Sequence, residues 1–346
     1  ASLGNAQDDR VSIGAKGLHG NGYRGLVVWD TEMYLVPFFT FTRPDAARAL
    51  LRYRCRLLPD ARENALAAGC PGARFPWNTS INGRERTFTG FGWQDHLQAD
   101  VAWAAAHYAA ATGDRAFHLE CGAKLIIETA RYWTGRVTWD ERRKQYGILN
   151  ICGTDEIHTG VDNNALTNYL ARWNLLRAAR AVEELREAGR WHKVRAELGV
   201  EPQEPARWCE MAERIVVPFD SRRGIHEQFE GFFRLREKKR DPDMTQAMFT
   251  GPVLHSLKPT KLSKQADTAL LYYLFPDDFS EAMRRRGYRY YERRSTHASS
   301  LSRSVYAALA AQVGITDEAY RLFIESAEID FGAKAENDTG IHAASL

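Results

Sequence analysis

The chain has 346 residues, 44% of them hydrophobic, and its 47 basic and 44 acidic residues give a formal net charge of +3. So balanced a charge argues against nucleic acid or a membrane surface as a partner, and the sequence holds no apolar run of about 18 residues that would predict a membrane-spanning helix. The five cysteines show no CxxC spacing, so we expect reduced thiols in a cytoplasmic protein, with neither a disulfide framework nor a metal site.

Apolar residues recur at helical spacing along most of the chain. The pattern predicts helices at 45–57, 97–111, 114–133, 164–185, 205–216, 264–274, 277–285, 300–313 and 316–329. The helix at 97–111 is apolar on nearly all sides and the next one only along one stripe, which indicates an inner and an outer layer. Because this pairing recurs, we expect an all-α fold of inner and outer helices joined by long functional loops. The short basic runs at 238–240 and 284–286 are expected to face solvent.

The most polar loop of the chain, at 153–164, precedes a long predicted helix. It holds the adjacent carboxylates Asp155 and Glu156, whose separate roles the residues alone leave open. Asp162 or Asn163 would cap the helix well, and capping is the simpler role for both. Polar loops held by rigid elements often carry chemistry, so we expect this loop to have a functional role beyond capping.

Aromatic residues stand beside hydrogen-bonding side chains in four separate parts of the sequence. The groups are Tyr23, Arg24, Trp29 and Asp30; Trp77; Asp155, Glu156 and His158; and Lys264, Gln265, Glu292, His297, Ser299 and Ser300. Sugars need this combination, because pyranose faces stack on aromatic rings and sugar hydroxyls bind polar side chains. Taken singly, the tryptophans also fit a hydrophobic core and the serines an ordinary helix cap, so these alternatives stay open here.

Cleavage of a glycosidic bond requires a carboxylic acid that protonates the leaving oxygen. The nucleophile attacks from the opposite face, and if it is water, a second carboxylate normally activates it. If the nucleophile is phosphate, the site must hold an anion with donors such as histidine, serine hydroxyls and N–H groups at a helix start. The run His297-Ala298-Ser299-Ser300, at the start of a predicted helix, fits the requirement for a site that holds phosphate.

Together these segments resemble glycoside hydrolase family 65, the maltose, trehalose and kojibiose phosphorylases and their hydrolase relatives. The matching motifs, in the family's order, are Gly22-Tyr23-Arg24-Gly25 through Glu32, Pro76-Trp77, 153–168, Lys264-Gln265-Ala266-Asp267, Tyr291-Glu292 through Ser302, and Gly340-Ile341-His342 through Ser345. The resemblance implies a six-fold (α/α) barrel formed by a single catalytic domain at 1–346. We expect this domain to be a fragment of a longer multidomain chain, with the first barrel helix missing.

The resemblance also implies a role for each candidate residue. Glu156 matches the family's general acid, and Glu292 stands where the hydrolases of the family place their base. The phosphate pocket is matched by His297, Ser299 and Ser300. Residues expected to bind the substrate are Tyr23, Arg24, Trp29, Asp30, Trp77, Lys264 and Gln265.

On this basis we expect inverting phosphorolysis of an α-linked glucose disaccharide to β-glucose 1-phosphate and a sugar. Glu156 is the expected acid, and phosphate is the co-substrate and nucleophile, with no cofactor and no metal. An inverting α-glucoside hydrolase of trehalase or kojibiose-hydrolase type, with Glu292 as base, is the alternative. A truncated homologue that only binds sugar or is inactive is a further one. The linkage, the acceptor and the oligomeric state, a homodimer included, stay open.

The loop at 153–164, which we call the acid loop, departs from the sequence that is usual in the family, Gly-Pro-Asp-Glu-Tyr-His-Glu. Thr154, Ile157 and Thr159 stand in place of the Pro, the Tyr and the second Glu. The acid is kept while its neighbours differ, so no single disaccharide specificity is carried over from the family. The loop at 77–87, which faces the acceptor sugar in the family, also has its own sequence.

Overall fold

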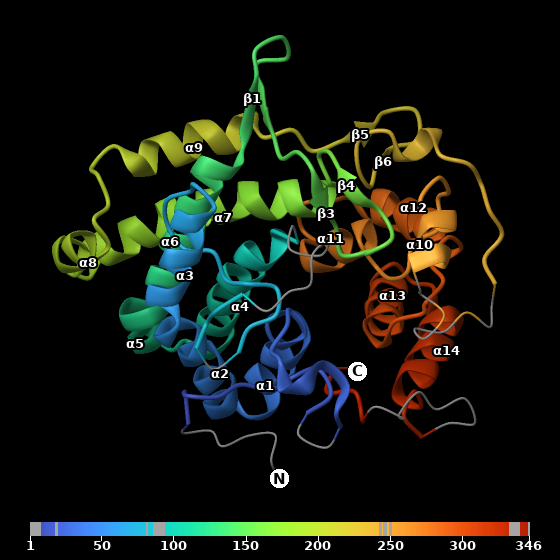
Figure 1. Cartoon of the computed structure of the whole chain (residues 1–346), viewed down its shortest axis with the longest axis horizontal. Coiled ribbons are helices and arrows are strands. Elements are labelled where there is room, and N and C mark those ends of the chain that lie inside the picture. The colour runs from blue at the N-terminus through green and yellow to red at the C-terminus, as the bar shows by residue number, and fades with distance from the viewer. Residues whose placement is uncertain are drawn as a thin grey trace. The chain divides into compact units, whose positions relative to one another are not determined.

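Helices make up most of the described chain, and its strands form three two-stranded antiparallel hairpins (Figure 1). This computed structural model describes residues 8–17, 20–80, 82–85, 94–241, 244, 248, 251–331 and 340–344. Residues 81, 86 and 87 of the predicted acceptor loop and residue 345 of the last family motif lie outside these ranges. Within them, no helix is long and apolar enough to cross a membrane, and no group of three or more His, Cys, Asp or Glu could hold a metal ion. The prediction of an all-α chain is confirmed.

The chain divides into two compact units. The first comprises Ala1–Gly147 and Leu170–Ile215, and the second comprises Ile148–Tyr169 and Val216–Leu346. The long helix α7 (Ala165–Glu187) begins in the second unit and continues in the first.

The first unit is organised around helix α4 (His96–Thr112), which packs against α1, α2 and α6. Its buried residues lie on nearly all sides, as the sequence predicted, and Gly113 ends it with a φ of +68°. The other elements of this unit are η1 (Gly22–Gly25), η2 (Thr31–Leu35), α1 (Val36–Thr42), α2 (Pro44–Arg56), α3 (Leu58–Ala67), α5 (Arg115–Phe117), η3 (His118–Gly122), α6 (Ala123–Arg136), β1 (Thr138–Asp140), β2 (Gln145–Gly147), α8 (Trp191–Leu198) and α9 (Glu204–Arg214).

In the second unit, α13 (Ser300–Gln312) packs along α14 (Thr316–Ala327), and both helices were predicted. Helix α11 (Thr268–Leu274) begins later than expected, so Lys264 and Gln265 lie in a loop and not in a helix. Helix α12 (Glu281–Glu292) extends beyond its predicted end. The other elements are β3 (Ile151–Cys152), β4 (Thr159–Val161), β5 (Phe219–Asp220), β6 (Ile225–His226), η4 (Phe232–Arg234) and α10 (Gly251–Leu257).

Two of the five cysteines are joined. Cys55 in α2 and Cys121 in η3 form a disulfide with their Cα atoms 6.0 Å apart, so the expectation of reduced thiols is wrong for this pair. The pairing depends on the packing of α2 against η3, which no local pattern in the sequence predicts. Cys70, Cys152 and Cys209 are free. Burial, reinforced by neighbouring carboxylates, raises the pKa of Cys152 well above its ordinary value, so this thiol is not poised to act as a nucleophile.

Candidate active site

The acid loop joins strands β3 and β4, which pair with a bulge between Ile151 and Cys152. Glu156 lies in this loop with a left-handed backbone, at a φ of 58°, a conformation that a residue with a Cβ keeps only where its surroundings hold it. Its N–H donates to the Gly153 carbonyl at 3.3 Å, and its side chain keeps 16% of its surface exposed. The loop therefore presents Glu156 in a fixed and partly accessible position.

Asp155, by contrast, is occupied by its neighbours. His158 Nδ1 lies 2.5 Å from one carboxylate oxygen, and Gln228 Nε2 donates to the same oxygen at 2.6 Å. The other ring nitrogen of His158 lies 2.9 Å from the Thr260 carbonyl oxygen. Because Asp155 is buried and held from two sides, it positions the loop, whereas the neighbouring Glu156 side chain stays partly exposed.

The Asp155–His158 pair predicts how stability depends on pH. Burial alone would lower the pKa of His158, but the Asp155 carboxylate outweighs it and raises that pKa above its ordinary value. A raised histidine pKa stabilises the folded state below the unfolded-state value of about 6.5, and this contribution is lost as pH rises through the folded-state pKa. Denaturant titrations should show the free energy of unfolding falling more between about pH 6 and about pH 9 in the wild-type protein than in His158→Asn. Equal falls would contradict the assignment.

The end of the acid loop is capped one residue later than predicted. Asn164, and not Asp162 or Asn163, caps α7, because its Oδ1 accepts the Thr167 N–H at 2.9 Å. The side chains of Asp162 and Asn163 instead accept backbone N–H groups from the start of the hairpin, at 2.9 and 3.0 Å. The prediction was wrong because these two oxygens have partners that lie outside the helix.

Gly153 starts the acid loop at a point where a side chain would collide with the loop's support. A Cβ there would lie 2.5 Å from Asp267 Oδ2 and 2.6 Å from Asn164 Nδ2. These two side chains bond each other at 3.0 Å, and Asp267 Oδ2 also accepts from the Thr154 hydroxyl at 3.1 Å. A proline has no hydroxyl, so Thr154 gives this chain its own link between the acid loop and Asp267.

Lys264 connects the acid loop to the predicted phosphate pocket. Its ammonium group contacts Glu156 Oε2, while its carbonyl oxygen accepts the N–H of Ala298 at 3.2 Å. The preceding residue, Ser263, pairs in parallel with Ser295, so the two loops run side by side. The structure thus brings the predicted acid and the predicted phosphate pocket together within one unit.

Gln265 bonds the acid loop with one polar atom, and its other polar atom has no hydrogen-bond partner among the described residues. Its Nε2 donates to the Thr154 carbonyl, whereas its Oε1 has no hydrogen-bond partner among the described residues although the side chain is buried. A buried acceptor without a partner costs about 1–3 kcal/mol. A sugar hydroxyl would supply the missing donor, which agrees with the predicted role of Gln265 in substrate binding.

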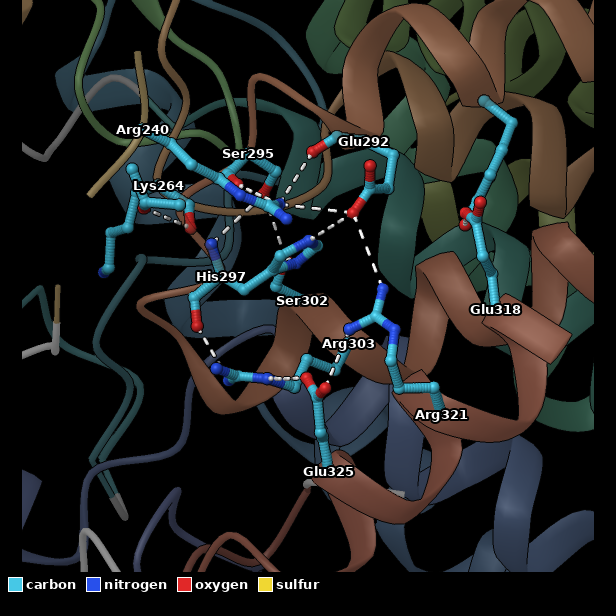
Figure 2. Close-up of polar contacts among 12 residues, drawn as sticks. Arg240, Lys264, Glu292, Ser295, His297, Ser302, Arg303, Glu318, Arg321 and Glu325 are labelled. Atoms are coloured by element: carbon cyan, nitrogen blue, oxygen red, sulfur yellow. Dashed lines mark hydrogen bonds and ion pairs between the residues drawn. The ribbon is translucent and has the colours of Figure 1, made fainter. Parts of the chain in front are cut away.

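His297 lies in the loop before α13 with a left-handed backbone, at a φ of 52°. Its Nδ1 is 2.9 Å from the Ser302 hydroxyl, and its Nε2 faces Glu292 Oε1 at 3.5 Å (Figure 2). That approach lies at the outer limit of hydrogen bonding, so Nε2 touches Glu292 only weakly and has no close hydrogen-bond partner within the described ranges. Burial lowers the pKa of His297, so the ring is neutral near neutral pH, and Nε2 can donate when the Ser302 hydroxyl donates to Nδ1.

Ser299 is the N-cap of α13, as the simpler interpretation allowed. Its Oγ accepts the Leu301 N–H at 3.3 Å, which leaves the hydroxyl proton to be donated. Ser300 is the first residue of the helix and is half-buried. Two serine hydroxyls and the first N–H groups of a helix therefore lie next to His297 in the chain, which is the kind of donor set that an anion requires.

Glu292 is the last residue of α12, and its carboxylate lies near two arginines. Its Oε1 lies 3.2 Å from Arg240 Nη1 and 4.0 Å from Arg321 Nη2. Burial opposes the charge, but His297 and Arg240 lower the pKa of Glu292 to about 2. A carboxylate of so low a pKa is a weak base and is poorly matched to activating water at neutral pH.

Arg240 belongs to a basic run that was expected to face solvent, and for this residue the expectation is wrong. Its side chain is 31% exposed, and Nη1 donates to the carbonyl oxygens of Glu292 and Ser295 at 3.2 and 3.1 Å (Figure 2). The neighbouring lysines make the run look like an ordinary solvated surface. No local signal in the sequence separates Arg240 from them, because its partners lie more than 50 positions away.

The first unit holds the other predicted sugar contacts. Trp29 and Trp77 stack with ring centroids 6.3 Å apart, because Val27 and Thr79 pair through two backbone hydrogen bonds of 2.9 Å. His96 meets both rings edge-on. Trp29 is buried, as the core alternative allowed, whereas Trp77 is half-buried. Trp77 is therefore the ring of the pair that keeps surface for a ligand.

Tyr23, Arg24 and Asp30 lie close to Trp29 in sequence. Tyr23 and Arg24 are exposed and have left-handed backbones in η1, with φ of 56° and 52°, and Asp30 is buried. Seven non-glycine residues in the described ranges have positive φ, and four of them are predicted site residues: Tyr23, Arg24, Glu156 and His297. Because such strain concentrates at functional sites, this agreement supports the predicted roles.

The chain belongs to glycosyl hydrolase family 65, since the model of that family's central catalytic domain matches residues 1–346. Over 99% of its length it is 41% identical to the kojibiose phosphorylase of Caldanaerobacter subterraneus subsp. tengcongensis. Over the same share it is 38% identical to the alpha,alpha-trehalose phosphorylase of Geobacillus stearothermophilus. The chain spans about half the length of these relatives, 47% and 46%.

Two solved structures also match the chain. A putative kojibiose phosphorylase from the human microbiome matches with a TM-score of 0.90 at 25% identity, over 98% of this chain and 46% of the other. A glycosidase in complex with glucose matches with a TM-score of 0.51 at 15% identity, over 94% of this chain and 81% of the other, and this shows the fold alone. Family membership and these likenesses confirm the predicted (α/α) barrel fold class.

Proposed function

We propose that the protein catalyses the inverting phosphorolysis of an α-linked glucose disaccharide, releasing β-glucose 1-phosphate and a second sugar. The observation that carries the proposal is the double contact of Lys264. Its ammonium group meets Glu156, and its carbonyl oxygen accepts the Ala298 N–H in the loop of His297. A proton donor and an anion-binding loop are thus held on adjoining segments, which favours a reaction between two positioned reactants.

In the proposed reaction, a phosphate oxygen attacks the anomeric carbon while the bond from that carbon to the glycosidic oxygen breaks. Glu156 gives its proton to the departing oxygen, and attack from the opposite face inverts the configuration. His297 Nε2 and the hydroxyls of Ser299 and Ser300 hold the phosphate. Lys264 must release Glu156 for that carboxyl to carry its proton, and a glucose hydroxyl would take over the ammonium group.

Phosphate is favoured over water by the state of Glu292. A hydrolase needs this carboxylate to take a proton from water, and Arg240 and His297 instead lower its pKa to about 2. Hydrolysis is therefore the second candidate, and it depends on Glu292 being released from these partners.

The substrate class is assigned to α-glucobioses. Kojibiose comes first, because the relative at 41% identity is a kojibiose phosphorylase, and α,α-trehalose comes second. The altered neighbours of the acid, Thr154, Ile157 and Thr159, make the choice between them a matter for direct measurement.

The test is to incubate the protein with kojibiose and, separately, with α,α-trehalose, with and without inorganic phosphate. Glucose 1-phosphate and free glucose are quantified, and NMR assigns the anomeric configuration of the phosphate ester. We expect β-glucose 1-phosphate and glucose in equal amounts, only when phosphate is present. Glucose release without phosphate would instead identify a hydrolase. Thermal stabilisation by glucose without any product would identify a sugar-binding homologue.

A further inference from the structure

The proposed phosphate pocket contains a carboxylate, and a carboxylate repels a phosphate anion. Glu292 Oε1 lies 3.5 Å from His297 Nε2, the nitrogen that the proposed function assigns to phosphate. The two side chains are 14% and 6% exposed, so water screens the repulsion only in part. If phosphate is the nucleophile, the charge of Glu292 has to be compensated inside the protein.

Arg240 supplies this compensation. Its Nη1 lies 3.2 Å from Glu292 Oε1, and the same nitrogen donates to the carbonyl oxygens of Glu292 and Ser295 at 3.2 and 3.1 Å (Figure 2). Three acceptors fix the guanidinium group, so its charge stays against Glu292. The contacts also bind the end of α12 to the start of the loop that carries His297.

The other arginines in Figure 2 approach Glu292 less closely or pair with another carboxylate. Arg321 approaches Glu292 only to 4.0 Å and pairs with Glu325 at 2.7 Å. Arg303 also pairs with Glu325, at 3.2 Å, and donates to a backbone carbonyl oxygen at 2.8 Å. Among the residues that the structure describes, Arg240 is therefore the arginine closest to the Glu292 carboxylate.

We infer that Arg240 is a positioning residue that selects phosphate over water as the nucleophile. With Arg240 in place, Glu292 is charge-compensated, and a phosphate oxygen attacks the anomeric carbon. Without Arg240, the released Glu292 carboxylate accepts a proton from water while the water oxygen attacks that carbon. Glu156 still protonates the leaving oxygen, so the products are two free sugars. The inference rests on the proposed function and adds the residue that decides which nucleophile, phosphate or water, is used.

The test compares the wild-type protein with Arg240→Gln, which keeps hydrogen-bond donors and removes the charge. Phosphate-dependent release of glucose 1-phosphate and phosphate-independent release of glucose from kojibiose are followed as phosphate is varied. In Arg240→Gln we expect the KM for phosphate to rise about tenfold or more, while the KM for kojibiose changes by less than about threefold. The ratio of hydrolysis to phosphorolysis should rise about tenfold or more, because Glu292 loses one of the partners that lower its pKa and becomes a stronger base.

Two further variants separate this role from a structural one. Arg240→Lys keeps the charge and should retain most of the preference for phosphate. Adding Glu292→Gln to Arg240→Gln should abolish the gained hydrolysis, because the base is then lost. The matched control is Arg284→Gln on the same helix as Glu292, since Arg284 bonds the Phe279 carbonyl and Gln312 and should leave the ratio unchanged.

Calorimetric titration with inorganic phosphate adds a readout that does not depend on turnover. Weaker phosphate binding to folded Arg240→Gln, restored in Arg240→Lys, is the expected result. An unchanged product ratio and phosphate affinity in Arg240→Gln, or a proportional loss of both activities, would overturn the inference and leave the proposed phosphorolysis standing. A wild-type protein that releases glucose without phosphate and forms no glucose 1-phosphate would overturn the proposed function and the inference with it.

Discussion

Replacing Glu156 by glutamine is expected to lower phosphate-dependent turnover of an α-glucobiose by about 100- to 10,000-fold, the range that general acid catalysis contributes. The amide has nearly the same shape and still offers an oxygen to Lys264, but it has no proton to give to the glycosidic oxygen. The loss should therefore fall on kcat, while the KM for the disaccharide stays within a few-fold of its wild-type value. Initial rates at saturating phosphate measure both quantities.

A substrate whose leaving group needs no proton provides the control for Glu156→Gln. Fluoride departs without protonation, so phosphorolysis of α-glucosyl fluoride should retain far more activity in this variant than phosphorolysis of the disaccharide. Equal losses on the two substrates would mean that Glu156 maintains the loop and does not act as the acid. A disaccharide activity above about a tenth of wild type would also contradict the assignment.

Replacing Arg54 by methionine is expected to destabilise the protein by about 3–5 kcal/mol, because it leaves the buried charge of Glu32 without a partner. Arg54 Nε and Nη2 bond the two Glu32 oxygens at 2.7 and 2.9 Å, and neither side chain is exposed. Burial alone would lower the pKa of Arg54, but Glu32 raises it above its ordinary value. Arg54 Nη1 also donates to the Thr79 hydroxyl at 2.9 Å, so the segment that carries Trp77 loses a support. Urea unfolding followed by tryptophan fluorescence measures the loss.

Two variants show whether the loss belongs to the buried pair. Removing both charges, in Glu32→Met with Arg54→Met, should recover much of the stability, because no unpaired buried charge then remains. The exposed pair of Arg285 and Glu281, 3.2 Å apart, provides the matched control, and Arg285→Met should cost less than about 1 kcal/mol. A loss in Arg54→Met no larger than in Arg285→Met would show that the buried pair does not hold this unit together.

The helices with strong patterns could be predicted from the sequence, and the others could not. Helix α4 is apolar on nearly all sides, and α13 and α14 are separated by a glycine with positive φ, so pattern and stop signal agree. Helices α3, α8 and α10 are short, with 10, 8 and 7 residues, and give too few turns for a periodic signal. The start of α11 was misplaced because Ser263 pairs with the distant Ser295, and this pairing keeps the preceding loop out of the helix.

The candidate site shows the same division between local and distant contacts. Glu156, Lys264 and His297 could be singled out because the motifs around them, taken together, resemble one family. The arginine partner of Glu292, the cap of α7 and the disulfide of Cys55 could not be predicted. The arginine contact and the disulfide join groups that lie far apart in sequence. The cap of α7 depends on which of several neighbouring polar side chains accepts a backbone N–H. Sequence patterns show residue types and their spacing, whereas these contacts form only when the helices and loops pack together.

The altered acid loop cannot be exchanged for the loop of a relative without changing the residues that pack against it. Ile157, which stands where the family usually has a tyrosine, is fully buried and packs with Leu257 and Leu262, and Val253 and Leu254 of α10 pack against this cluster. Grafting a relative's loop into this chain would place a larger, hydroxyl-bearing ring into that apolar cluster, and overpacked cores typically lose about 1–3 kcal/mol. Libraries that aim to change the acceptor sugar should therefore vary α10 together with the acid loop.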